Sequence, residues 1–97
     1  MRIISGKTLK EYYLTHPETE GALKTWYHEV RGEAWKNPQD VLQKYPKARP
    51  IPGNRVIFNI MGNKYRLVVA IHYVSALVYI RFIGTHKEYD SINAEEV

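Results

Sequence analysis

Apolar residues in the first half of the chain recur at the spacing of amphipathic helices. Leucine and tyrosine side chains form one stripe over residues 7–15, and the following His16-Pro17 pair predicts the end of this first helix. A second helix is predicted from about residue 17 or 18 to residue 30, because its large apolar positions repeat every 3.6 residues. Asn37-Pro38 is typical of a helix start and predicts a short third helix.

The second half of the chain is richer in β-branched and aromatic residues and changes to strand-like patterns. Three strands are predicted, at residues 55–60, 64–73 and 77–83. Residues 61–63 and 74–76 separate them and have the composition of turns. Connections this short favour antiparallel pairing between neighbouring strands.

The remaining segments complete the predicted architecture. Residues 2–5 are β-prone and could form a short strand, whereas the prolines of residues 46–54 predict an irregular connection. The tail over residues 85–97 is polar, with one helical turn expected at residues 87–90. Helices followed by an antiparallel meander predict a single α+β domain over residues 1–97, with the N-terminal helices packed on one face of a small, mainly antiparallel sheet. We expect the other face of the sheet to be open.

Strand alternation divides the side chains between the two faces of this sheet. One set is uniformly large and apolar and is expected to face the helices: Val56, Phe58, Ile60, Tyr65, Leu67, Val69, Ile71, Val78, Ile80 and Phe82. The opposite face is expected to gather polar and aromatic residues: Arg55, Asn59, Lys64, Arg66, Tyr79 and Arg81, with Ile83 beside them. Just past its edge follow Thr85, His86, Lys87 and Tyr89.

Composition and charge fit this picture. The 97 residues are 44% hydrophobic and 25% charged, as in ordinary globular domains, and the net charge of +4 favours polyanionic partners. There is no cysteine, which excludes disulfides, thiolate metal sites and cysteine nucleophiles. No signal-peptide core and no apolar run of about 20 residues is found, so we expect a cytoplasmic protein without membrane association.

The chemistry available on the outward face is suited to RNA. Cations bind phosphates and aromatic rings stack on bases, which is what single-stranded nucleic acid requires. The four histidines are scattered and no glycine-rich phosphate loop is found, so a catalytic metal and a nucleotide cofactor are not expected. RNA carries its own nucleophile, the 2′-hydroxyl, so cleavage needs only phosphate neutralisation and the movement of two protons. Arginines could stabilise the phosphorane, and His86 and Tyr89 could move protons.

Two segments of the strand-rich half resemble the HigB family of bacterial toxins, within the RelE superfamily of type II toxin–antitoxin systems. Residues 56–67 read VIFNIMGNKYRL, close to the family pattern VFNIGGNKYRL. Residues 78–90 read VYIRFIGTHKEYD, close to the pattern YIRxxxTHxEYD. The resemblance covers nearly the whole chain. One departure is Met61, which stands where the family usually has glycine.

The resemblance implies a RelE-like fold and an mRNA interferase that acts on mRNA in the ribosomal A site without metal. It also implies a HigA-type helix-turn-helix antitoxin, with operator DNA contacted only through that antitoxin. Arg66 corresponds to the strand arginine, and His86 and Tyr89 to the acid–base positions after the last strand. Lys64 and Arg81 match basic positions and complete the expected catalytic set. The residues expected to bind RNA around it are Arg55, Asn59, Asn63, Tyr79 and Lys87.

Two other functions remain open from the residues alone. The same basic face could belong to a non-catalytic module that binds RNA or the ribosome, or to an interaction protein that docks an acidic partner. A charged outward face is also often only a solvated surface, and this is the ordinary interpretation of Arg55 or His72 taken singly. The aromatic residues of the helical half are expected in the core rather than in a base-stacking platform.

Overall fold

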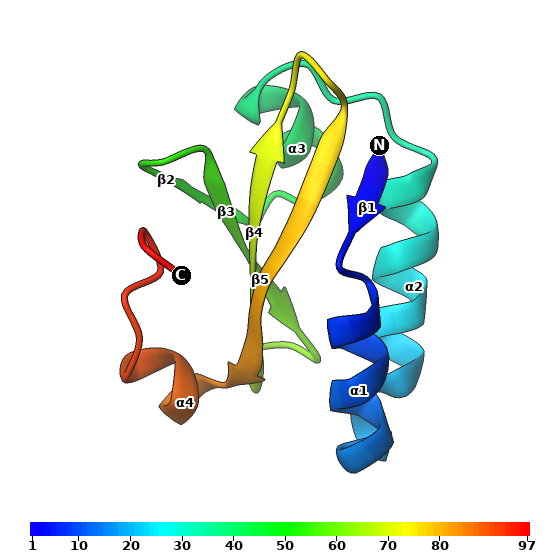
Figure 1. The fold of residues 1–97 in the computed structure, drawn as a ribbon, viewed down its shortest axis with the longest axis vertical. Helices are drawn as coiled ribbons and strands as arrows, with labels where there is room; N and C mark the ends of the chain where they lie inside the picture. Colours follow the sequence, from blue (N-terminus) through cyan, green and yellow to red (C-terminus); the bar gives the residue numbers. More distant parts are fainter.

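Five strands form one sheet, with the helices arranged around it (Figure 1). The computed structural model describes residues 1–97. The strand order is β1-β5-β4-β3-β2, with β1 parallel to β5 and the other neighbours antiparallel, so the predicted α+β, mainly antiparallel fold is confirmed. The elements in chain order are β1 (Arg2–Ile4), α1 (Lys7–Thr15), a 3-10 turn (Pro17–Thr19), α2 (Glu20–Arg31), α3 (Pro38–Lys44), β2 (Arg49–Ile51), β3 (Arg55–Ile60), β4 (Tyr65–His72), β5 (Leu77–Thr85) and α4 (His86–Asp90).

The helices form where the sequence predicted them, and their ends have local causes. Helix α1 has the predicted bounds, whereas α2 begins later than predicted because a 3-10 turn that starts at Pro17 precedes it. Asn37 caps α3, since its side-chain oxygen accepts a hydrogen bond from the backbone N–H of Asp40 at 3.0 Å. None of the helices combines the length and apolar character that crossing a bilayer requires.

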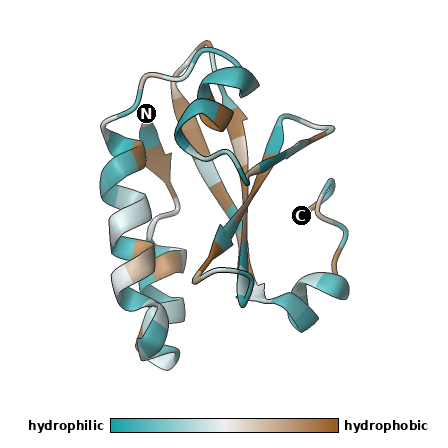
Figure 2. Cartoon of the chain, turned by 180° about the vertical axis from the view of Figure 1, so that it is seen from behind, coloured by the Kyte–Doolittle hydropathy of each residue, from teal (hydrophilic) through white to brown (hydrophobic).

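The core lies between the sheet and helices α1 and α2. Leu23, Trp26 and Val30 from α2 are buried against apolar side chains of β3, β4 and β5. Phe58 is at its aromatic centre, because its ring lies 5.4 Å from that of Trp26 and 5.1 Å from that of Tyr45. Figure 2 shows hydrophobic residues concentrated on the strands and hydrophilic residues over much of the helical surface. The apolar face predicted for β3 and β4 is therefore confirmed.

Strand β2 was not predicted, and the expectation of an irregular connection over residues 46–54 was wrong in this part. Residues Arg49–Ile51 pair antiparallel with β3 at the edge of the sheet. Proline cannot donate a ladder hydrogen bond, but an edge strand tolerates it because one side of the strand has no partner. Because of Pro50, the sequence pattern does not indicate this short strand, which places Arg49 on the outward face of the sheet.

A β-bulge in β5 reverses the alternation predicted for its second half. Val68 pairs with Phe82 whereas Val69 pairs with Ile80, so Arg81 is an extra residue without a partner in the register. The prediction that Phe82 lies in the core and Ile83 opposite was therefore wrong. Ile83 is buried in the core cluster, and Phe82 is half-buried on the outward face.

The outward face is partly covered, which corrects the expectation of an open surface. We call residues 86–97 the C-terminal segment; it stands on the side of the sheet opposite α1 and α2 (Figure 1). Arg55 fastens its end, since Nε and Nη2 donate to the carbonyl oxygen of Val97 at 3.2 and 2.6 Å. Ile57 and Val68, which are neighbours on this face, are 4% and 0% exposed.

The bulge gives a direct test of this register. Ile83→Asn places an amide in the core and should lower the free energy of unfolding by about 3–5 kcal/mol. Phe82→Asn loses only part of the burial of a ring on the outward face and should cost about 1–2 kcal/mol. Urea unfolding of both variants measures the difference, and a larger loss for Phe82→Asn would contradict the bulge.

Candidate active site

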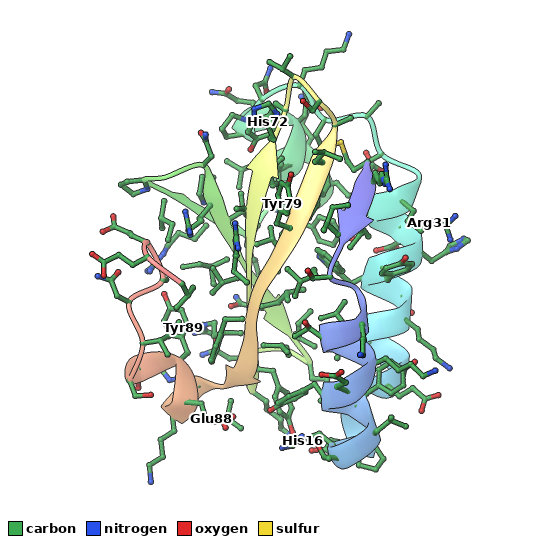
Figure 3. The ribbon with its side chains drawn as sticks, in the orientation of Figure 1. His16, Arg31, His72, Tyr79, Glu88 and Tyr89 are labelled. Carbon is green, nitrogen blue, oxygen red and sulfur yellow. The ribbon has the colours of Figure 1, made fainter.

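An open hollow of about 340 Å³ lies where the outward face of the sheet meets the C-terminal segment. Its walls come from elements far apart in the sequence, namely the β2 edge, the middle strands β3 and β4, and helix α4. The lining residues are Lys47, Arg49, Ile57, Asn59, Arg66, His86, Tyr89 and Asp90. Figure 3 shows Tyr89 between α4 and the sheet, directed toward the strands.

Two arginines hold the phenol of Tyr89. The Arg66 guanidinium carbon lies 5.9 Å from the centre of the Tyr89 ring, in cation–π contact. Arg49 Nη2 donates to Tyr89 Oη at 3.3 Å, and Arg66 Nη1 donates to the carbonyl oxygen of Asn63 at 3.4 Å. Because the phenol oxygen accepts from Arg49, the hydroxyl proton of Tyr89 can be donated to another acceptor.

An aspartate orients His86 within the same helix. His86 Nδ1 lies 3.3 Å from Asp90 Oδ2, four residues later on α4. When Nδ1 carries the proton and donates it to this carboxylate, Nε2 is the ring nitrogen that accepts one. The arrangement therefore places a ring nitrogen that can accept a proton, on His86, and a phenol that can donate one, on Tyr89, in the same hollow as two guanidinium groups.

A capping box closes the first turn of α4. Thr85 Oγ1 accepts from the backbone N–H of Glu88 at 3.1 Å, and Glu88 Oε1 accepts from the backbone N–H of Thr85 at 2.7 Å. Tyr12 Oη also donates to Glu88 Oε1, at 3.4 Å. The Thr85 backbone N–H, as the largest cause, lowers the pKa of Glu88, so the carboxylate is ionised at neutral pH.

The structure brings four of the predicted residues into the hollow, Asn59, Arg66, His86 and Tyr89, with the Asn63 carbonyl supporting Arg66. Four lining residues were not predicted as site residues: Lys47, Arg49, Ile57 and Asp90. Arg49 was missed because β2 was missed, and Lys47 lies two residues before that strand begins. The signal that could have found Asp90 is its spacing of four residues from His86, which places both on one side of a helix.

Lys64 and Arg81 lie outside the hollow. Lys64 is exposed at the turn before β4, and its carbonyl oxygen accepts a hydrogen bond from the backbone N–H of His86 at 3.1 Å. Arg81, the bulge residue, lies 5.4 Å from the centre of the Tyr79 ring and lines a shallow depression with residues of α1. Arg81 is therefore not among the residues that line the hollow with Arg66.

Arg55 and Lys87 are also separate from the hollow. Arg55 is held by Val97 and by the carbonyl oxygen of Gly53. Lys87 is exposed on α4. Among the described residues 1–97, no group of three or more His, Asp and Glu side chains comes together that could hold a metal ion.

The α+β fold, with a basic hollow where α4 brings a histidine and a tyrosine against the sheet, is consistent with one class of protein, the RelE-like toxin domains. A comparison with known families identifies the family. Residues 19–92 match the HigB toxin family, described as the RelE-like toxic component of a toxin–antitoxin system, and the chain belongs to it. Membership implies an antitoxin as a partner and RNA as the substrate.

Curated relatives match over nearly their full length. The mRNA interferase toxin HigB of Escherichia coli K12 is 28% identical over 96 residues, which cover 97% of this chain and 92% of the relative. The mRNA interferase HigB of Shigella flexneri has the same identity and coverage. The mRNA interferase HigB of Escherichia coli O6:H1 is 22% identical over 94 residues, 95% of this chain and 91% of the relative.

The hollow predicts how affinity for RNA depends on salt. Each phosphate contact to a single strand contributes about 0.7 to the slope of log affinity against log salt. Arg49→Ala and Arg66→Ala should each reduce the slope by about that amount for a short RNA. Fluorescence anisotropy at several salt concentrations measures it. Lys10→Ala, which removes an exposed cation on α1, is the control, and an equal loss of slope in this variant would contradict the assignment.

Proposed function

We propose that this toxin cleaves translated mRNA in the ribosomal A site by attack of the RNA 2′-hydroxyl. As a HigB-family toxin, the chain is an mRNA interferase, that is, an endoribonuclease. The observation that carries the proposed mechanism is the convergence of Arg49, Arg66, His86 and Tyr89 on one hollow. Each step of this chemistry has a matching group there.

His86 acts as the base and Tyr89 as the acid in this proposal. Nε2 of His86 takes the 2′-hydroxyl proton, because Asp90 favours the tautomer with the proton on Nδ1. The 2′-oxygen then bonds to phosphorus, and the bond from phosphorus to the 5′-oxygen breaks. Tyr89 gives its hydroxyl proton to the departing 5′-oxygen, supported by the Arg49 contact. The products are a 2′,3′-cyclic phosphate and a 5′-hydroxyl.

The arginines stabilise the charge that develops on the phosphorane. Arg66 and Arg49 can approach the phosphate oxygens from β4 and β2, and Lys47 adds a third cation at the rim. Asn59, also in the hollow, offers an amide for hydrogen bonds to a base or sugar. We assign contacts with flanking nucleotides or with ribosomal RNA to the residues outside the hollow, namely Lys64, Tyr79, Arg81 and Lys87. Arg55 can join them only when its contact with Val97 opens.

The partners in this proposal follow from the family. A HigA-type helix-turn-helix antitoxin neutralises the toxin and contacts operator DNA on behalf of the complex. The ribosome presents single-stranded mRNA, the form in which the backbone is free to adopt in-line geometry. Residues 1–97 act as one domain, in the cytoplasm, where translation takes place.

Removal of the proposed base should abolish toxicity. His86→Ala should lower the cleavage rate by about 10²- to 10⁴-fold. Arg66→Ala should lower it by about 10²- to 10³-fold. Primer extension on mRNA from induced cells locates the cuts, and growth curves report toxicity. His28→Ala, which removes an exposed histidine of α2, is the matched control and should remain toxic. Unchanged growth arrest by His86→Ala would contradict the assigned site.

The reaction products and the requirement for translation can be tested together. The purified toxin should cut mRNA on translating ribosomes and leave a 2′,3′-cyclic phosphate, which resists 3′ ligation until it is opened. The same mRNA without ribosomes should be cut at least about tenfold more slowly, since a free strand is not held in line. Binding with a steep salt dependence but no cut product would instead indicate a non-catalytic RNA-binding module.

A further inference from the structure

Helix α4 carries the proposed acid and base, yet it is too short to be stable alone. It has five residues, and none of them is buried. A single helical turn is not self-sustaining, because nucleation fixes several residues for one hydrogen bond. Its orientation must therefore come from contacts with its surroundings, which include the hydrogen bonds at its two ends and the contacts of Tyr89 with Arg49 and Arg66. These contacts determine whether His86 and Tyr89 point into the hollow.

The capping box provides those contacts at the start of the helix. The reciprocal hydrogen bonds between Thr85 and Glu88 satisfy two backbone N–H groups and fix where the helix begins. At the other end, Ser91 Oγ donates to the carbonyl oxygen of Glu88 at 2.7 Å. Glu88 therefore makes hydrogen bonds at both ends of the turn, through its side chain at the start and through its carbonyl group at the end.

The surroundings of Glu88 connect the turn to the body of the protein. Tyr12 of α1 donates to the same carboxylate oxygen, and its ring stacks on that of His16 with 4.0 Å between ring centres. Gly84 leaves room for this closure: a Cβ there would lie 3.1 Å from Glu88 Oε1 and 2.6 Å from Phe82 Cζ. The box is therefore seated between β5, α1 and the Phe82 ring.

The helical repeat links the box to the hollow. Thr85 and Glu88 are three residues apart and therefore project from one side of the helix, and the same holds for His86 and Tyr89. Around the helix axis, the second pair is rotated from the first by the angle of one residue. Figure 3 shows Glu88 at the lower end of the molecule, with Tyr89 on the side facing the strands. Hydrogen bonds that fix the orientation of Thr85 and Glu88 consequently fix the direction in which His86 and Tyr89 project.

We propose that Thr85 and Glu88 are positioning residues for the cleavage reaction, because their capping box turns His86 and Tyr89 toward Arg66. The proposal rests on the function proposed above. It assigns Glu88 no proton transfer, although Glu88 is a carboxylate close to the site. It also gives a physical reason for the spacing in the sequence Thr85-His86-Lys87-Glu88-Tyr89, because each capping residue is followed directly by a residue that lines the hollow.

The test separates capping from chemistry by paired substitutions. Thr85→Ala and Glu88→Ala open the box, whereas Thr85→Ser and Glu88→Gln retain groups that can close it. The Ala variants should lose about 10- to 100-fold in kcat on ribosome-bound mRNA, with KM within about twofold, because misplacement of reacting groups is costly. The Ser and Gln variants should recover most of kcat. Glu11→Gln, on exposed α1, is the control for removal of a carboxylate.

Each outcome decides for or against the proposal. Wild-type kcat in both Ala variants overturns it, and so does a Gln variant as inactive as the Ala variant, since that result would assign chemistry to the carboxylate. Amide hydrogen exchange in the full chain is the second measurement. It should accelerate at residues 86–89 in the Ala variants, while protection of β4 and the thermal midpoint stay unchanged. If the wild type cuts no RNA, the proposed function fails, and exchange alone still decides whether the box orders α4.

Discussion

A single extra residue in β5 determines how the two faces of the sheet are used. Because Arg81 bulges out of the ladder, Ile83 turns into the core and Phe82 turns to the outward face. The same shift sets Gly84 opposite Arg66. The space that a side chain would need at Gly84 is taken by the Phe82 ring and the Glu88 carboxylate, which lie 2.6 and 3.1 Å from where a Cβ would be. The bulge thus turns the Phe82 ring outward over Gly84 and leaves Arg81 outside the hollow that Arg66 lines.

One wall of the hollow is held firmly by the sheet, whereas the opposite wall is held by few contacts. Arg66 projects from a central strand whose neighbours on both sides are paired, so its backbone is held by the ladder and the core. His86 and Tyr89 project from an exposed turn held by a few hydrogen bonds. In the proposed mechanism, the phosphate-binding Arg66 therefore lies on the stable part of the fold, and the proposed proton-transfer groups lie on a part that can open at low cost. Such an arrangement admits a bulky polymer while keeping the cations in register.

The sequence predicted the elements better than it predicted the site. Periodicity gave α1 its bounds and identified β3, β4 and β5, since β3 and β4 have a regular apolar face and β5 has one up to its bulge. It could not reveal the bulge, because one inserted residue leaves the composition of β5 unchanged. It missed β2, since a proline at an edge strand has the same appearance as a proline in a loop. Arg49 was consequently absent from the predicted site, whereas Arg66, His86 and Tyr89 were recovered because they lie in contiguous motifs.

The charges of the sheet-forming half have a thermodynamic consequence. Between Asp40 and Glu88 every charged residue is a lysine or an arginine, so the cations of the hollow meet carboxylates only from the C-terminal segment. The folded protein therefore carries electrostatic repulsion that the extended chain largely avoids. An anion seated in the hollow relieves this repulsion and binds the native state alone. By linkage, the substrate is also a folding ligand: a polyanion at 100 times its dissociation constant would add about 2.7 kcal/mol to the stability of the toxin.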